Sequence, residues 1–275
     1  MTDAVTVLLI GGGNRFPAYI GALKALEEKR LTIRKLIGAS TAGIVAALYA
    51  CGKGPDEIAE LVGALDTESF RDHKRRGLTT GMGLYAGEAL EEWLEQAFAG
   101  ATFGSRLRHP LQIIATDMQN YRPLTFSADH HPEVKLSLAC RGSAAIPWVF
   151  APKECTLRNR QHLLVDGSLM AGLVEIALNR TGERTLSFKV VSRRSLRQEG
   201  VRRGDWRRYW NEIFAFYLHA QEKEFIKGGH WRDNIMLHCG EIPPNRFSLT
   251  LDEQRTLCHE GYLQTMKYLE YKWGI

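Results

Sequence analysis

The stretch KLIGASTAGIVAALYA, residues 35–50, passes from an apolar segment through a turn of small residues directly into a helix-like segment. This order predicts a strand over residues 31–37 and a helix over residues 41–51, with Ser40 at the sharp turn between them. A serine at such a turn is a candidate nucleophile, although it is also typical of a plain helix N-cap. The nucleophile-elbow pattern G-x-S-x-G has glycine two residues after the serine, whereas this chain has Ala42 there and glycine one residue later.

Apolar strands and helix-like segments alternate around this stretch. Residues 5–10 are a continuous apolar run that ends in three glycines, which is typical of a strand buried on both faces of a parallel sheet. Pro17 fits the first turn of a helix over residues 18–29. Further strands are expected at residues 111–116, 123–126, 163–165, 186–191 and 235–239, and further helices at residues 55–65, 87–99, 133–141, 206–225 and 251–271.

This alternation predicts an α/β fold with a largely parallel central sheet flanked by helices. No internal repeat or linker divides the sequence, so we expect a single domain over residues 1–275. The chain is 44% hydrophobic and 24% charged, as in ordinary globular proteins. Five cysteines without a C-x-x-C pair argue against a disulfide framework and a zinc site. Neither a signal peptide nor a membrane-spanning run is recognisable, which favours a cytoplasmic protein.

Three glycines, Gly11, Gly12 and Gly13, follow the first apolar run. A dinucleotide fingerprint G-x-G-x-x-G would need glycine where the chain has Phe16, and an acidic residue at the end of the next strand, which is absent. Glycines allow close backbone approach, and their N–H groups before a helix can bind an anion. The loop is therefore a candidate oxyanion hole, although alone it is equally typical of a tight turn without chemistry.

A serine nucleophile needs a base. Asp166 directly follows a short apolar strand and precedes a glycine, which would place it at the carboxyl edge of the sheet, near Ser40. Burial there would raise the pKa of its carboxyl group and make it a better proton acceptor. An ordinary Asp-Gly turn is the structural alternative, and Asp117 is a rival carboxylate. His162 shares the strand with Asp166, but no histidine lies in a typical triad loop, so a Ser-Asp dyad is the simpler hypothesis.

In their order along the chain, these segments resemble those of the patatin-like phospholipases. The matching segments are GGGNR at 11–15 for the oxyanion loop G-G-G-x-R/K-G, GASTAG at 38–43 for the elbow, GSAAIPWVFAP at 142–152, and LLVDGS at 163–168 for the D-G-G/A motif. The similarity runs from residue 5 to about residue 173, and the closing helix is similar too.

The resemblance implies a three-layer patatin-like fold and a lipid acyl hydrolase that needs no metal or other cofactor. Ser40 would be the nucleophile and Asp166 its partner. The three glycines would donate to the oxyanion, and Arg15 would take the family's basic position in that loop. An acyl-enzyme would form and water would release the fatty acid. The alternatives are a catalytically weak or inactive lipid-binding homologue and an acyltransferase of similar build.

The chain departs from the family pattern in three places. Phe16 and Pro17 replace the small residues that usually follow the basic one, Ala42 replaces the last elbow glycine, and Ser168 stands third in the aspartate motif. None of these changes deletes a reacting group, which favours a working enzyme.

A basic and aromatic segment, SRRSLRQEGVRRGDWRRYW at residues 192–210, contains seven arginines. Arginine together with tryptophan suits contact with an anionic lipid surface, and the net charge of +5 is compatible with it. A solvated loop leading into a helix is an equally good interpretation. No nucleic-acid partner is expected, because nothing in the chain matches a nucleic-acid-binding module.

Overall fold

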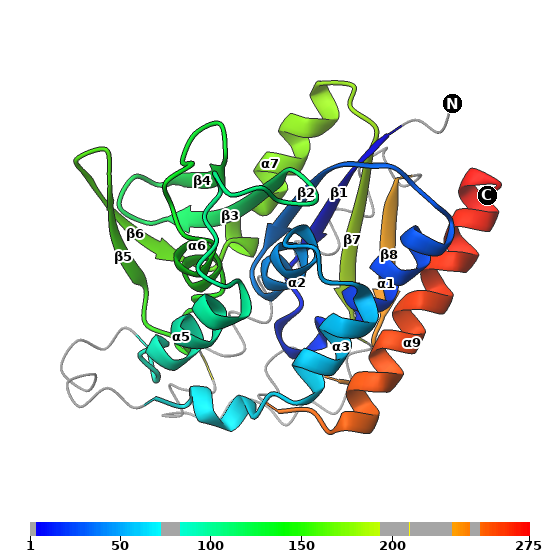
Figure 1. Cartoon of the computed structure of the whole chain (residues 1–275), viewed down its shortest axis with the longest axis horizontal. Helices are drawn as coiled ribbons and strands as arrows, with labels where there is room; N and C mark the ends of the chain where they lie inside the picture. Colours follow the sequence, from blue (N-terminus) through cyan, green and yellow to red (C-terminus); the bar gives the residue numbers. More distant parts are fainter. Residues whose placement is uncertain (1–3, 73–82, 193–208, 210–232, 243–247) are drawn as a thin grey trace.

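The structure, a computed structural model, describes residues 4–72, 83–192, 209, 233–242 and 248–275 (Figure 1). Its sheet has the strand order β5-β6-β3-β2-β1-β7-β8, and β4 pairs with β3. The strands are β1 (Val5–Ile10), β2 (Ile33–Ala39), β3 (Leu111–Asp117), β4 (Arg122–Ser127), β5 (Lys153–Leu157), β6 (Arg160–Val165), β7 (Thr185–Val191) and β8 (Asn234–His238).

The α-helices lie between these strands in the sequence. They are α1 (Pro17–Glu28), α2 (Thr41–Ala50), α3 (Pro55–Gly63), α5 (Glu88–Ala97), α6 (Leu136–Ser143), α7 (Ser168–Arg180) and α9 (Leu251–Tyr268). Short 3-10 turns occupy Gly13–Arg15 (η1) and Thr67–Phe70 (η2), and a π-helical turn, Leu269–Trp273 (η3), follows α9. The helix expected over residues 206–225 and most of the arginine-rich segment lie outside the described residues.

The middle of the sheet is parallel, as the alternation of strands and helices predicted. Strands β3, β2, β1, β7 and β8 are joined by parallel pairings. Strands β4 and β6 run antiparallel to β3, and β5 runs antiparallel to β6. The α/β class with a mainly parallel sheet is therefore confirmed, with an antiparallel extension at the β5 end that the sequence did not indicate.

Two apolar cores make the fold three-layered. Along β1, Val7 and Leu9 belong to the main core, which helices α1, α2, α3, α5, α6 and α9 share, while Leu8 and Ile10 pack with Ala171 of α7. Because successive side chains of a strand point to opposite faces, the helices cover both faces of the sheet (Figure 1). This explains why the first strand reads as a continuous apolar run.

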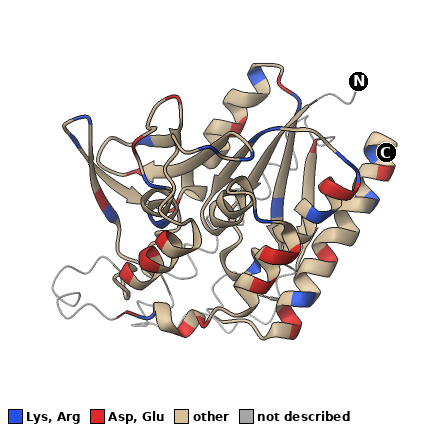
Figure 2. Ribbon diagram, viewed as in Figure 1, with Lys and Arg blue, Asp and Glu red and all other residues tan. Residues whose placement is uncertain are grey.

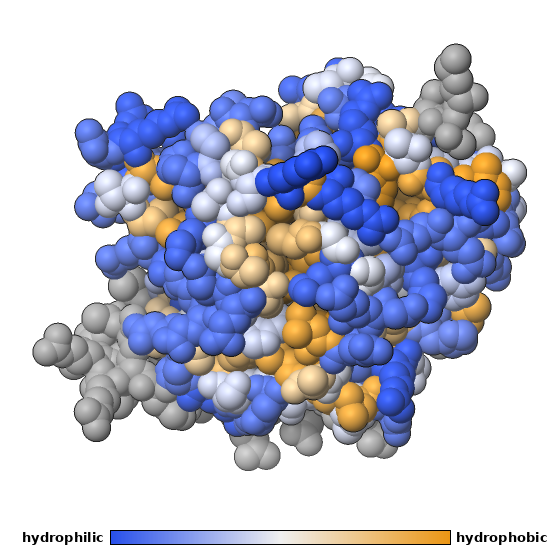
Figure 3. Space-filling model, in the orientation of Figure 1, coloured by the Kyte–Doolittle hydropathy of each residue, from blue (hydrophilic) through white to orange (hydrophobic). Residues whose placement is uncertain are grey.

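Charged residues lie mainly on the outer faces of the helices and in the connecting segments (Figure 2). The face seen in Figure 3 is mostly hydrophilic, with apolar residues exposed in smaller areas between. No described helix combines the length and the apolar character of a membrane span.

Candidate active site

Ser40 occupies a strained turn between β2 and α2. Its φ of 61° and ψ of −146° lie in a region that residues other than glycine rarely adopt, at a typical cost of about 1–3 kcal/mol. Gly38 and Gly43 allow the strand and the helix to cross closely, since a Cβ on Gly38 would lie 2.5 Å from the Gly43 Cα. Gly43, which stands one residue after the position of the last glycine in the elbow pattern, thus allows the close contact between β2 and α2. Ala42, which occupies that position, is fully buried in the main core.

The ends of β2 and β6 meet head to head beside β3. Strand β2 runs parallel to β3 and ends with Ala39 opposite Ile114, whereas β6 runs antiparallel and ends with Val165 opposite Thr116. Strand β4 pairs along one edge of β3, so β2 and β6 share the other edge. The carboxyl ends of β2 and β6 therefore approach each other next to Ala115. The residues that follow, Ser40 and Asp166, are thereby brought together.

The Ser40 hydroxyl donates to the Asp166 Oδ2 at 2.6 Å, and both residues are buried. The sequence placed Asp166 at the carboxyl edge that parallel strands share. The structure does place Asp166 beside Ser40, but the expected strand direction was wrong, because β6 is antiparallel to β3. Burial raises the pKa of Asp166, and hydrogen bonds from Ser168 and Ser40 oppose this rise. The carboxyl group is therefore a stronger proton acceptor than an exposed aspartate.

The rival groups Asp117 and His162 bind each other. The His162 Nδ1 lies 2.7 Å from the Asp117 Oδ2, which also accepts a hydrogen bond from Asn120 at 2.6 Å. Burial acts to raise the pKa of Asp117, but the hydrogen bonds from Asn120 and His162 outweigh it and lower the pKa. The pair links β3 to β6, and neither side chain has a hydrogen bond to Ser40 within the described part of the chain.

Positive φ angles in all three residues shape the glycine loop, with 71° at Gly11, 120° at Gly12 and 53° at Gly13. The Gly11 N–H donates to the Ala39 carbonyl at 3.1 Å, so it is not free for an oxyanion. This narrows the predicted donor set to Gly12 and Gly13, whose N–H groups have no acceptor among the described residues.

Hydrogen bonds to the loop carbonyls orient its peptide groups. The Gly11 carbonyl accepts from the Ala42 N–H at 3.2 Å, and the Gly12 carbonyl accepts from the Arg15 N–H at 3.0 Å and the Arg15 Nε at 3.1 Å. In a planar trans peptide the N–H points opposite to the carbonyl. The Gly12 N–H is therefore directed away from α2, and the Gly13 N–H away from Arg15.

The Arg15 side chain is 5% exposed, and its contact with the glycine loop is the hydrogen bond from Nε to the Gly12 carbonyl. Its Nη1 also donates to the Ser192 hydroxyl at 2.8 Å, which connects the loop to the end of β7. The sequence predicted a basic group within the oxyanion loop. In the structure the Arg15 guanidinium donates to the Gly12 carbonyl and so stabilises the conformation of the loop. Phe16 and Pro17 lead from this loop into α1, where Pro17 is buried and Phe16 packs against the main core.

Three polar residues that sequence reasoning did not assign hold the site together. The Ser143 hydroxyl accepts from the Ser40 N–H at 2.8 Å and donates to the Ile114 carbonyl at 2.5 Å. Thr41 donates to the Gly13 carbonyl at 2.9 Å, and Ser168 binds the Asp166 Oδ1. The sequence contained indications of two of these residues. Ser143 lies in the segment 142–152 that resembles the family, and Ser168 is the third residue of the aspartate motif, where the chain departs from the family pattern.

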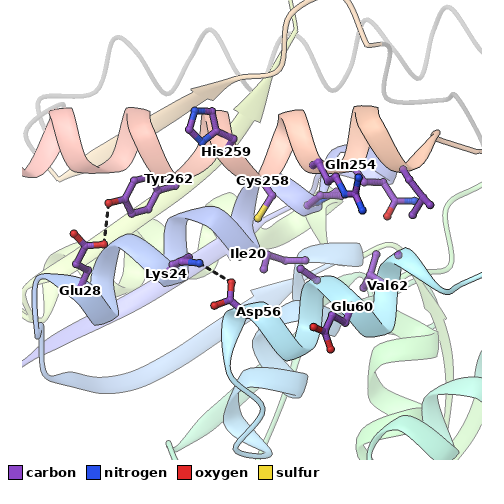
Figure 4. A pocket seen from close by; sticks show the side chains of 15 residues that line it. Ile20, Lys24, Glu28, Asp56, Glu60, Val62, Gln254, Cys258, His259 and Tyr262 are labelled. Atoms are coloured by element: carbon purple, nitrogen blue, oxygen red, sulfur yellow. Dashed lines mark hydrogen bonds and ion pairs between the residues drawn. The ribbon is translucent and has the colours of Figure 1, made fainter.

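A groove of about 660 Å³ lies elsewhere, between α1, α3 and α9 (Figure 4). Ile20 and Val62 contribute to its apolar lining, and an ion pair between Lys24 and Asp56 crosses it at 2.6 Å. Neither Ser40 nor any residue of the glycine loop lines it. The groove is therefore separate from the candidate active site.

The site combines a serine hydroxyl, a buried carboxylate and two N–H groups, of Gly12 and Gly13, that have no acceptor within the part of the chain that the structure describes. This set suits acyl transfer, in which the carboxylate takes the serine proton and the donors stabilise the oxyanion. Among the described residues, no group of three or more histidine, cysteine, aspartate or glutamate side chains is placed to hold a metal ion.

Comparison with known proteins places the chain in a family. The protein YqhO of Bacillus subtilis (strain 168) is 23% identical over 94% of this chain and 96% of its own length. The crystal structure of VipD from Legionella pneumophila matches with a TM-score of 0.65 and 16% identity over 98% of this chain and 67% of that chain. The type III effector ExoU from Pseudomonas aeruginosa matches with a TM-score of 0.54 and 13% identity over 98% of this chain and 53% of that chain.

At these identities the two solved structures show a shared fold. The family model of the patatin-like phospholipases matches residues 7–178, more than half of the chain, which includes the glycine loop, the elbow and the aspartate motif. The chain therefore belongs to the patatin-like phospholipase family.

Proposed function

We propose that the chain is a serine hydrolase of lipid acyl esters, of the phospholipase A or lysophospholipase type, that uses a Ser40–Asp166 dyad. The carrying observation is the 2.6 Å hydrogen bond from the Ser40 hydroxyl to the buried Asp166 carboxylate. Membership of the patatin-like phospholipase family supports a lipid ester as the substrate class. The proposed oxyanion donors are the N–H groups of Gly12 and Gly13.

In the first half-reaction, Asp166 takes the Ser40 proton as the serine oxygen attacks the ester carbonyl carbon. The negative charge that develops on the carbonyl oxygen is stabilised by the glycine-loop N–H donors. The tetrahedral intermediate collapses, the C–O bond to the alcohol breaks, and Asp166 gives its proton to that alcohol oxygen. An acyl ester on Ser40 remains.

In the second half-reaction, a water molecule attacks the acyl carbonyl carbon and gives a proton to Asp166. Collapse of the second intermediate breaks the bond to the Ser40 oxygen, which takes the proton back from Asp166. The fatty acid leaves and the dyad is restored. Burial assists proton uptake by Asp166 in both half-reactions, because a carboxylate away from water accepts a proton more readily.

Two further parts of the proposal rest on the sequence. The arginine-rich segment of residues 192–210 is the proposed contact with an anionic lipid surface, and it lies largely outside the described residues. A cytoplasmic, peripherally membrane-associated enzyme is the corresponding proposal for its location.

The test is release of free fatty acid from mixed phospholipids, with labelling of the nucleophile by a fluorophosphonate. Ser40→Ala and Asp166→Asn are each expected to abolish release, and the label should map to Ser40. Undiminished release by either variant would contradict the dyad. Absence of labelling, with liposome binding retained, would indicate a non-catalytic lipid-binding homologue. Acyl transfer to an added alcohol in preference to water would indicate an acyltransferase.

A further inference from the structure

The Asp166 carboxylate lies between two serine hydroxyls. Its Oδ2 accepts from Ser40 at 2.6 Å, and its Oδ1 accepts from the Ser168 hydroxyl at 2.5 Å. The Ser168 N–H also donates to Oδ1, at 2.8 Å. One carboxylate oxygen is thus occupied by two donors of a single residue, while the other faces the elbow serine.

Neighbouring contacts fix the chain segment that carries this arrangement. The Asp166 N–H donates to the Ala145 carbonyl at 3.0 Å, and the Asp166 carbonyl accepts from the Thr116 hydroxyl at 2.8 Å. Gly167 packs so closely against β3 that a Cβ there would lie 1.9 Å from the Ile114 carbonyl oxygen. Because the backbone on both sides of the carboxylate is held, Ser168 presents its donors to Oδ1 from a defined position.

The two serines are not equivalent. Ser40 has the strained elbow conformation and follows β2, whereas Ser168 is the first residue of α7 and binds a carboxylate only two residues away. The bond from the Ser168 N–H to the Asp166 Oδ1 is a local contact of the kind that aspartate forms with a backbone N–H two residues later. Ser168 follows Asp166 by two residues in the motif Asp166-Gly167-Ser168, so its hydroxyl lies within local reach of the carboxylate.

The titratable groups on the surrounding elements are engaged with other partners. Asp117 of β3 and His162 of β6 bind each other, and Glu175 of α7 pairs with Lys189 of β7 at 3.3 Å. Arg141 of α6 donates to backbone carbonyls. Burial raises the pKa of Asp166, whereas the hydroxyl groups of Ser168 and Ser40 and the Ser168 N–H donate to the carboxylate and favour its charged form.

We propose that Ser168 is a positioning residue of the hydrolase reaction, which holds Oδ1 of Asp166 so that Oδ2 faces the Ser40 hydroxyl. The inference rests on the proposed roles of Ser40 and Asp166. It assigns Ser168 no contact with the substrate. Its consequence is that the acid limb of the activity profile depends on a residue outside the dyad.

The test compares Ser168→Ala with Ser168→Thr, which keeps the hydroxyl. Loss of one donor to the carboxylate is expected to move the acid limb of kcat/KM upward by about one pH unit and to lower kcat about tenfold, with KM little changed. Ser168→Thr should restore the acid limb. Ser127→Ala is the matched control, because that buried hydroxyl has no hydrogen-bond partner in the described chain and lies on β4.

A second readout does not require activity. The 13C signal of the Asp166 carboxyl carbon, identified by its loss in Asp166→Asn, should titrate at higher pH in Ser168→Ala than in the wild type. An unchanged acid limb together with an unchanged titration would overturn the role of Ser168. A fluorophosphonate adduct on Ser168 would also overturn it, because Ser168 would then be the nucleophile. If the wild type hydrolyses no ester, the dyad proposal fails, and the carbon titration alone decides whether Ser168 positions Asp166.

Discussion

The Ser40 N–H and the Ser143 hydroxyl are joined by a 2.8 Å hydrogen bond, which ties the proposed nucleophile to the end of α6. The Ser143 carbonyl accepts from the Gly167 N–H at 2.9 Å, so the same residue also holds the chain beside Asp166. One serine on α6 therefore connects the two strand ends that carry the dyad.

Ser143→Ala removes the acceptor of the Ser40 N–H in a buried turn that is already strained. We expect a loss of about 1–3 kcal/mol in the free energy of unfolding, since an unsatisfied buried donor costs about that much. Fluorophosphonate labelling of Ser40 should also slow, because the elbow is less well held. Urea unfolding and labelling rates measure the two effects. Labelling at the wild-type rate would show that the elbow keeps its geometry without Ser143.

Thr41→Val keeps the shape of the side chain and removes the hydroxyl that donates to the Gly13 carbonyl. The peptide groups of the glycine loop then lose one of the contacts that orient them. We expect kcat to fall about tenfold with little change in KM, since removing an interaction that serves the transition state lowers kcat. Thr41→Ser is the control and should retain most activity. A rise in KM at constant kcat would assign Thr41 to substrate binding.

Asp166→Asn should make the protein more stable at neutral pH while it abolishes activity. Burial raises the pKa of Asp166 above its unfolded value, so the native state binds the proton more tightly. Stability from this group is fully present below the unfolded pKa and is lost as the pH rises through the folded pKa. The advantage of the variant should therefore shrink on acidification. Urea unfolding between pH 4 and pH 7 measures it, and a constant difference would contradict the prediction.

Gly261→Ala tests the close packing of α9 against α1. A Cβ at this position would lie 2.0 Å from the Ala18 carbonyl oxygen, which is far inside van der Waals contact. We expect destabilisation by about 1–3 kcal/mol or more, because backbone atoms must move apart. Thermal or urea unfolding gives the value. Gly172→Ala on α7 is the matched control, because nothing lies within 4 Å of its added methyl, and it should be neutral or slightly stabilising.

The sequence by itself determined the local units of this protein. A buried strand, a tight turn and a helix follow from residue pattern and turn chemistry, so Ser40 could be placed at an elbow. The order of the glycine loop, the elbow and the aspartate motif indicated the family and the three-layer α/β class, which the comparisons confirm. The roles of Ser40 and Asp166 stay predictions, although the structure brings the two side chains within hydrogen-bond distance.

Only the tertiary structure decided how these units meet. Strand direction depends on pairings between distant residues, so the head-to-head approach of β6 and β2 could not be read from the residues before Asp166. The same holds for Gly11, whose N–H is occupied by the Ala39 carbonyl of a neighbouring strand. Local sequence fixes which groups a turn presents, whereas long-range hydrogen bonds decide which of them remain free for chemistry.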